Sequence, residues 1–185
     1  TDQLDLWQIH NLQKMADVDR MLAPDGALKA FQKAKSEGLV RFIGVTGHFE
    51  PNVLREMIQR AELDCILLAV NAADRHYLSF LEHLMPTCLE KQMGIIGMKV
   101  ATRGRMLSTW KPEPLEQQPE RMRTAKPGSI TMAESLAYNF SLPVSTNIVG
   151  VDNVAQLEED VKCAANFVPL SLEQMRALEE RTLPI

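Results

Sequence analysis

The sequence predicts an α/β fold built on a parallel sheet. Short β-branched or apolar runs alternate along the chain with longer segments whose apolar residues recur at helical spacing. This alternation is typical of βαβ units, in which a helix connects two parallel strands. Five strands are expected, at residues 4–9, 42–45, 65–70, 94–100 and 144–149.

Helix signals lie between and after these strands. Asp25 can cap a helix over residues 26–36, and Gly38 can end it. Pro51 suits the first position of a helix over residues 51–61. This order of elements fits either an open doubly wound sheet or part of a (β/α)8 barrel. The remaining helices are expected at residues 77–91, from Ser129 to Phe140, from Asn153 to Asn166 and after Ser171.

Composition narrows the classes of function. With 185 residues, 45% of them hydrophobic, the chain can bury one core, so a single domain over residues 1–185 is expected. A net charge of −4 without any Lys/Arg run argues against binding to nucleic acid or to an anionic membrane. No apolar run is long enough to cross a bilayer. Small molecules or further copies of the chain are the expected partners.

Cysteine and histidine spacing predicts neither disulfides nor a metal site. The three cysteines, Cys65, Cys88 and Cys163, are odd in number and far apart, and the four histidines lack metal-ligand spacing. A reducing cytoplasm is the simplest location. Glycine motifs for phosphate are also missing, since no GxGxxG follows the first strand and no GxxxxGK[ST] occurs. Residues 101–127 form the one long irregular loop, of a length that is usually functional or mobile.

The candidate functional residues follow the strands, because ligands of parallel α/β folds bind at the carboxyl ends of strands. His10 could donate a hydrogen bond to a carbonyl oxygen or help transfer its proton, or it could be a polar loop residue. His48 is either a solvated loop residue or a ligand contact. Lys99 could form a Schiff base, or pair with a carboxylate or a ligand phosphate. The helix opening at Asn153, just after Gly150, is a ready anion site.

Four blocks, in order along nearly the whole chain, resemble the aldo-keto reductase family. Residues 4–11 (LDLWQIHN) resemble its fourth strand, which ends D-L-x-x-I-H, and residues 38–47 (GLVRFIGVTG) resemble its G-x-[VI]-R-x-I-G-V-S-N segment on strand five. Residues 71–75 resemble the N-x-x-D-R turn after strand six. Residues 147–160 resemble the strand-eight block that holds the adenosine end of NADP.

The resemblance implies a TIM-type (β/α)8 barrel, of which this chain supplies strands four to eight with their helices. The N-terminal three βα units are absent from the chain, and Thr1, with neither an initiator Met nor a leader, is expected to be a cut inside a longer protein. The implied activity is reduction of an aldehyde or ketone to an alcohol by hydride transfer from NAD(P)H.

The implied catalytic tetrad is Asp, Tyr, Lys and His, and His10 matches its histidine. The other three members lie on earlier strands, and neither Tyr77 nor Tyr138 falls where the family places its acid. The chain alone is therefore expected to be inactive. The alternative is a catalytically silent fragment that binds nucleotide or acts as an interaction module, with a homo-oligomer covering its open sheet edge.

The resemblance also implies a set of cofactor contacts. Thr46 and Gly47 occupy the Ser-Asn positions that hold the carboxamide, and Asn71 is a candidate substitute for the family's strand-six glutamine. NADP is the expected cofactor. NAD is the alternative, because Asp152 stands where many members place a cation for the 2′-phosphate. The implied cofactor-binding residues are Thr46, Gly47, Asn71, Lys99, Gly150, Val151, Asn153, Gln156, Glu159 and Asp160.

Overall fold

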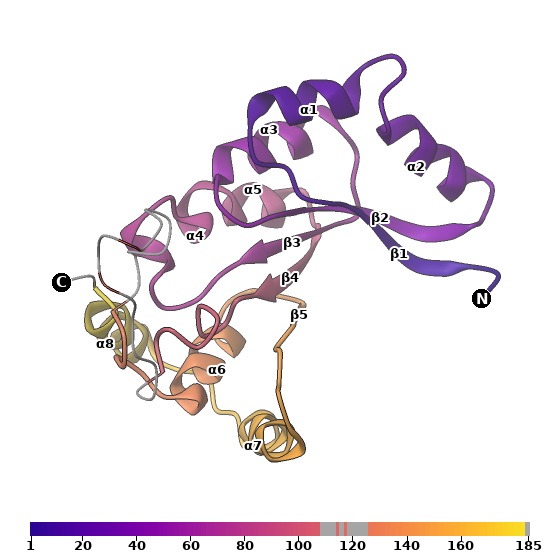
Figure 1. Ribbon diagram of the computed structural model, residues 1–185. Helices are drawn as coiled ribbons and strands as arrows, with labels where there is room; N and C mark the ends of the chain where they lie inside the picture. Colours follow the sequence, from indigo (N-terminus) through magenta and orange to yellow (C-terminus); the bar gives the residue numbers. More distant parts are fainter. Residues whose placement is uncertain (108–113, 115–116, 118–125, 184–185) are drawn as a thin grey trace. The chain divides into compact units, whose positions relative to one another are not determined.

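The computed structural model describes residues 1–107, 114, 117 and 126–183, and it contains a parallel sheet whose strands alternate with helices (Figure 1). The α/β class predicted from the sequence is confirmed, and all five expected strands are present. Most of the 101–127 segment, which we predict to be an irregular loop, lies outside the described residues. The strands, in the order β1-β2-β3-β4-β5, are β1 (Leu4–Ile9), β2 (Val40–Gly47), β3 (Cys65–Ala69), β4 (Gly94–Met98) and β5 (Thr146–Asn147).

The helices depart from the prediction mainly near the N-terminus. Helix α1 (Met15–Leu22) is absent from the expected helices. Its Val18 is buried in the core, and the Asp17 carboxylate accepts hydrogen bonds from the backbone N–H groups of Gln13 and Lys14, both at 3.1 Å. The helices are α1 (Met15–Leu22), α2 (Leu28–Ser36), α3 (Pro51–Arg60), the 3-10 helix η1 (Asp74–His76), α4 (Phe80–His83), α5 (Met85–Glu90), α6 (Met132–Phe140), α7 (Val154–Ala165) and α8 (Leu172–Arg181).

Three further boundaries differ for identifiable reasons. The helix expected over residues 77–91 is broken into α4 and α5 at Leu84, two residues before Pro86, which lacks a backbone N–H. Ser129 does not cap α6, because Thr131 forms a capping box with Glu134 instead. Asp25 does not cap α2, which begins after Ala27 without a side-chain cap.

The chain divides into two compact units. The first contains residues 1–68 and 78–96, and the second contains residues 69–77 and 97–185. Strands β3 and β4 contribute residues to both units. No helix in the described part of the chain has both the length and the apolar character that are needed to span a membrane.

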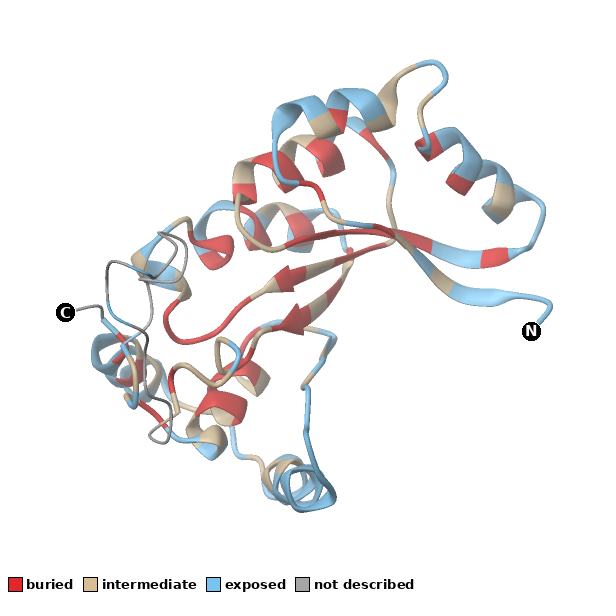
Figure 2. Ribbon diagram, viewed as in Figure 1, coloured by how far each residue is buried: buried red, intermediate tan, exposed pale blue. Residues whose placement is uncertain are grey.

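The first unit is organised around β2. Strands β1 and β2 pair in parallel with Ile9 opposite Val45, and β2 pairs with β3 with Gly44 opposite Cys65. Helix α3 covers β2, and the side chains at this contact are fully enclosed, as the red residues of β2 and α3 show (Figure 2). The fully buried residues of these two elements are Val45, Leu54, Met57 and Ile58.

In the second unit one buried amide joins strand ends. Asn139 of α6 is completely buried, and its Nδ2 donates to the Val70 carbonyl at 2.9 Å and to Asn147 Oδ1 at 3.1 Å. Backbone hydrogen bonds from Val70 to Met98 and from Ile148 to the Gly97 carbonyl complete the connection. The carboxyl ends of β3, β4 and β5 are therefore fixed relative to one another by α6 within this unit.

Gly44 gives a direct test of how closely β2 and β3 approach. A Cβ at Gly44 would lie 2.5 Å from Cys65 Sγ and 2.8 Å from the Cys65 carbonyl oxygen, and the latter is backbone that cannot rotate away. We expect Gly44→Ala to lower the free energy of unfolding by about 1–3 kcal/mol, the range typical of overpacking. Urea denaturation measures this change. Gly150→Ala is the control, since nothing lies within 4 Å of a Cβ there, and equal effects of the two substitutions would contradict the argument.

Candidate functional site

The carboxyl ends of β1 and β2 bring together several polar residues that follow them. The parallel register places His10 directly after the Ile9–Val45 pair, next to Thr46, and Leu12 N–H donates to the Thr46 carbonyl at 3.1 Å. The rings of His10 and His48 lie with their centroids 6.0 Å apart at an angle of 73°. Thus three predicted site residues, His10, Thr46 and Gly47, lie at one edge of the first unit.

Thr46 carries the clearest sign of a ligand contact. Its side chain is only 3% exposed, and among the described residues its Oγ1 has no hydrogen-bond partner. Buried hydroxyl groups in folded proteins are normally hydrogen-bonded, because leaving one unsatisfied costs about 1–3 kcal/mol. A bound amide or other polar group would satisfy this hydroxyl.

Gly47 is explained by packing. A Cβ at this position would lie 2.6 Å from Leu54 Cδ1 of α3. The strand end therefore needs a residue without a side chain in order to sit against the helix. Since Gly47 presents only backbone, any contact that it makes with a ligand comes from its peptide groups.

A cavity of about 300 Å³ adjoins His10 in the first unit. It lies between the loop after β1 and helix α1, and its wall contains two cations and one carboxylate. That carboxylate, Asp17, also has Arg20 at 3.7 Å, and its pKa is lowered chiefly by the backbone N–H of Gln13. The lining residues are His10, Asn11, Leu12, Gln13, Lys14, Asp17, Arg20 and Met21.

Asn71 and Lys99 lie together in the second unit, but the Asn71 amide is already engaged. Its Nδ2 donates to the Lys99 carbonyl at 3.1 Å, and its Oδ1 accepts from the Ala73 N–H at 2.9 Å. The side chain thereby joins the segments that follow β3 and β4. Lys99 has a φ of 58°, an unusual backbone conformation for a residue other than glycine, of the kind that often accompanies functional sites.

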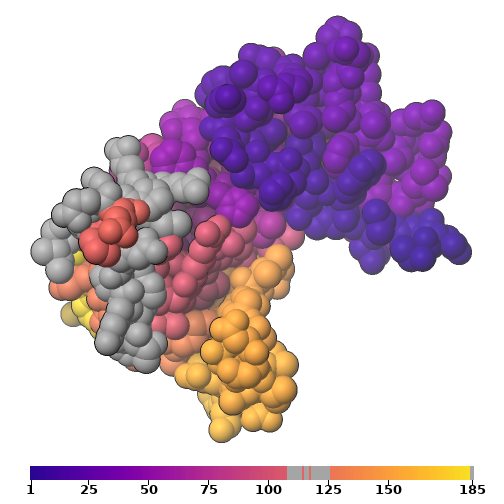
Figure 3. Space-filling model, in the orientation of Figure 1, coloured from indigo at the N-terminus to yellow at the C-terminus, as the bar shows by residue number. Residues whose placement is uncertain are grey.

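The predicted adenosine-binding segment forms the start of α7. Asn153 caps the helix by accepting from the Gln156 N–H at 3.1 Å, while Gln156 Oε1 accepts from the Asp152 N–H at 2.6 Å. Gly150 and Val151 are exposed, as are most side chains of α7 (Figure 3, light orange).

Electrostatically, this segment is acidic. Residues 146–161 contain four carboxylates and no Lys or Arg. Partial burial, together with the negative charge of Glu159, raises the pKa of Asp160. An incoming phosphate would therefore meet only helix N–H groups here, and no cationic side chain from this stretch.

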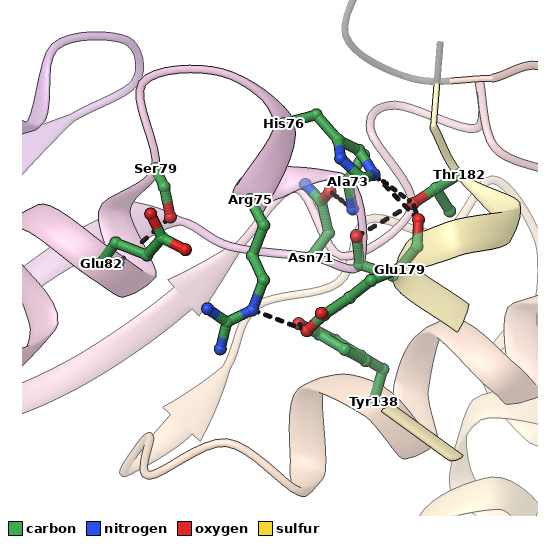
Figure 4. Close-up of polar contacts among 10 residues, drawn as sticks. Asn71, Ala73, Arg75, His76, Ser79, Glu82, Tyr138, Glu179 and Thr182 are labelled. Carbon is green, nitrogen blue, oxygen red and sulfur yellow. Dashed lines mark hydrogen bonds and ion pairs between the residues drawn. The ribbon is translucent and has the colours of Figure 1, made fainter. Parts of the chain in front are cut away.

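The second unit also contains a polar network around the Glu179 carboxylate that the sequence patterns did not reveal (Figure 4). The Tyr138 hydroxyl donates to Glu179 Oε1 at 2.7 Å, and Arg75 Nε donates to the same oxygen at 2.7 Å. Thr182 Oγ1 donates to the Ala72 carbonyl at 2.9 Å. Helix α8 is thus held to the turn that contains Asn71, and burial beside the Glu179 carboxylate raises the pKa of Tyr138.

Metal ligands do not gather in the described part of the chain, where no group of three or more His, Cys, Asp or Glu side chains could hold an ion. The polar residues at the strand ends are instead hydrogen-bonding groups with few charges. Their arrangement suits recognition of a polar organic ligand.

Comparison with known proteins identifies the family to which this chain belongs. The sequence model of the aldo/keto reductase family matches residues 1–182. The chain therefore belongs to the aldo/keto reductase family, an oxidoreductase family, which confirms the resemblance seen in the sequence blocks.

The individual relatives have low sequence identity to this chain and are longer than it. An uncharacterised oxidoreductase of Bacillus subtilis is 26% identical over 203 residues, covering 98% of this chain and 61% of the relative. L-galactose dehydrogenase of Arabidopsis thaliana is 26% identical over 186 residues, covering 94% and 56%. This chain thus spans less than two thirds of the length of these relatives.

Solved structures show the same fold. The holo form of an aldo-keto reductase from Bacillus halodurans matches with a TM-score of 0.73 at 22% identity, over 98% of this chain and 60% of that one. A Klebsiella pneumoniae aldo-keto reductase in complex with NADPH matches with a TM-score of 0.66 at 17% identity, over 100% and 61%. The chain therefore has the α/β fold of these (β/α)8-barrel proteins, as predicted, and covers about 60% of each of them.

Tyr138 tests the network between α6 and α8. Tyr138→Phe removes one hydrogen bond to the Glu179 carboxylate, and we expect it to lower the free energy of unfolding by about 1–2 kcal/mol. Thermal or urea unfolding measures the change. Tyr77→Phe, at a side chain that is 42% exposed, should have a smaller effect, and the reverse order would show that the network is not stabilising.

Proposed function

We propose that the protein to which this chain belongs reduces an aldehyde or ketone to an alcohol by hydride transfer from a nicotinamide cofactor. The observation that carries the proposal is the Thr46 hydroxyl, which is buried beside His10 and lacks a partner among the described residues. A nicotinamide carboxamide would supply the missing hydrogen bond. Membership of the aldo/keto reductase family supports this assignment. Because the chain spans only part of its relatives, the activity is proposed for the whole protein.

His10 and Thr46 have different tasks in the proposed reaction. An imidazole N–H of His10 donates to the substrate carbonyl oxygen, which orients the carbonyl and stabilises the negative charge that develops on its oxygen. The Thr46 hydroxyl bonds to the carboxamide and fixes the orientation of the ring. The cofactor, when bound, supplies the hydride. The resemblance implies a tyrosine as the acid of this reaction, and residues 1–68 and 78–96, which include His10 and Thr46, contain none. We therefore expect that this chain alone does not turn over substrate.

The adenosine end of the cofactor is proposed to bind at the start of α7, with Asn71 and Lys99 along the strand ends. The segment offers peptide groups at Gly150 and Val151 and polar side chains at Asn153, Gln156 and Glu159. Four carboxylates without a cation over residues 146–161 favour a ribose hydroxyl, which can donate to a carboxylate, over a 2′-phosphate. We therefore infer that NADH is accepted at least as well as NADPH.

The cysteines support the cytoplasm as the location. Burial raises the pKa of the Cys65 thiol to about 11 and that of Cys88 to about 12, and all three cysteines are unpaired. Unpaired thiols persist in reducing compartments.

The reaction is tested with the whole protein and simple aldehydes, by following loss of the absorbance of the reduced nicotinamide. We expect His10→Gln to lower kcat/KM by about a hundredfold, the scale of general acid–base assistance. Thr46→Val should weaken cofactor binding about tenfold, the equivalent of one hydrogen bond. It should leave the free energy of unfolding unchanged or higher, because no bond between described residues is lost. Cofactor binding without turnover by the wild type would instead identify a silent nucleotide-binding module.

Cofactor choice is tested at Asp152. Fluorescence titration of the wild-type protein should give a dissociation constant for NADH equal to or lower than that for NADPH. Asp152→Lys should shift the ratio toward NADPH by about tenfold, since one unfavourable charge is replaced by a favourable one. Asp25→Lys makes the same charge change at an exposed residue of the first unit and should leave the ratio unchanged. A wild-type protein that binds NADPH much more tightly would refute the inference.

A further inference from the structure

We propose that the carboxyl end of α8 (residues 179–182) positions the cofactor-binding residues Asn71 and Lys99, and that Thr182 and Glu179 are the positioning residues. The inference rests on the proposed function, because it takes Asn71 and Lys99 as part of the cofactor site. Every residue on which it depends belongs to the second unit. Helix α8 thereby sets how tightly the cofactor is bound without touching it.

The first observation is the backbone conformation of Lys99. Its φ of 58° lies in the left-handed region, where a residue with a side chain stays only if the surrounding structure holds it. Its carbonyl oxygen accepts a hydrogen bond from Asn71 Nδ2 at 3.1 Å and another from the Thr102 N–H at 2.8 Å. The Asn71 side chain is therefore one of the restraints that keep the segment after β4 in this conformation.

Asn71 depends in turn on the conformation of the residues that follow it. Its Oδ1 accepts from the Ala73 N–H at 2.9 Å, so the amide reaches the Lys99 carbonyl while residues 71–73 keep their present arrangement. Ala72 and Ala73 are almost fully buried, and their methyl groups form no hydrogen bonds. Further polar support for this part of the turn therefore comes from other segments.

The carboxyl end of α8 supplies that support (Figure 4). The fully buried Thr182 donates through its hydroxyl to the Ala72 carbonyl at 2.9 Å. Nε2 of His76 lies 2.8 Å from the Glu179 carbonyl oxygen, which only accepts, so Nε2 is the donor in this contact. The Glu179 carboxylate accepts from Arg75 Nε at 2.7 Å. These contacts tie the turn after β3 to one end of the helix.

Glu179 is itself held in place from α6. The buried Tyr138 hydroxyl and Arg75 Nε both donate to Glu179 Oε1, each at 2.7 Å. A carboxylate with two donors on one oxygen has little freedom to move, so the helix end is a fixed support for the turn. Binding residues that are already ordered lose less conformational freedom when a ligand binds. The cofactor therefore binds more tightly to strand ends that α8 holds than to strand ends that it has released.

The test measures cofactor affinity in variants of the whole protein. Thr182→Val removes the hydroxyl from a side chain of similar shape, and we expect the dissociation constant for the cofactor to rise about tenfold, the equivalent of one hydrogen bond. At saturating cofactor kcat should change little, because His10 and Thr46 belong to the first unit. Thr182→Ser keeps the hydroxyl and should restore the wild-type affinity.

Thr131→Val is the matched control. The Thr131 hydroxyl forms the capping box of α6 with Glu134, in the same unit. Its loss should lower the free energy of unfolding and leave the dissociation constant for the cofactor unchanged. If Thr182 had only a structural role, the two valine variants would bind the cofactor equally well at temperatures where both are folded, and this result would overturn the proposal.

A readout without cofactor separates this inference from the proposed function. Hydrogen exchange of the Thr102 N–H, which donates to the Lys99 carbonyl, should be about tenfold faster in Thr182→Val than in the wild type or in Thr131→Val. Unchanged exchange would overturn the inference. If the wild type bound no nicotinamide cofactor, the proposed function would fall together with this inference, whereas wild-type binding that Thr182→Val leaves unchanged would overturn the inference alone.

Discussion

The pairing of β1 with β2 is the constraint on which the candidate site depends. Ile9 is the one buried residue of β1, and it lies opposite the buried Val45 of β2, so packing at this pair helps to specify the register. A slip by one residue would turn Ile9 out of the core. It would also separate His10 from Thr46 and break the backbone bond between Leu12 and Thr46. Two loops that lie far apart in the sequence are thus brought together by the strand register, by the buried Ile9–Val45 pair and by the bond between Leu12 and Thr46.

In the second unit hydrogen-bonded polar groups have the corresponding role. Asn139 joins the strand ends from inside the core, and Glu179 joins α8 to α6 through Tyr138 and to the turn after β3 through Arg75. Such groups cost free energy when a bond is missing, and Asn139 makes its bonds through Nδ2 while its Oδ1 has no partner among the described residues. The two units therefore use different means to fix the ends of their strands: apolar packing under β2 in the first, and a hydrogen-bonded network in the second.

Local patterns predicted the strands and most helices, because alternation of apolar runs depends on neighbours in the sequence. Helix α1 was missed, since only Val18 of its eight residues is buried and its amino end is fixed by Asp17 rather than by a preceding cap. The position of His10 followed from the strand before it. The contact between Asn11 and His48 joins residues 37 apart and depends on strand register, so no local pattern could reveal it. The same holds for the bond from Tyr138 to Glu179.

The close approach of β2 to β3 also has a consequence for the chemistry of Cys65. The thiol is enclosed opposite Gly44, and burial is the main cause of its raised pKa, about 11. At neutral pH it is almost entirely in the protonated form, which is a poor nucleophile. Separation of the two strands would remove the burial that raises this pKa. Alkylation of Cys65 should therefore be slow, and where the sheet recloses faster than the reagent reacts, its rate should report the fraction of molecules in which this part of the first unit is open.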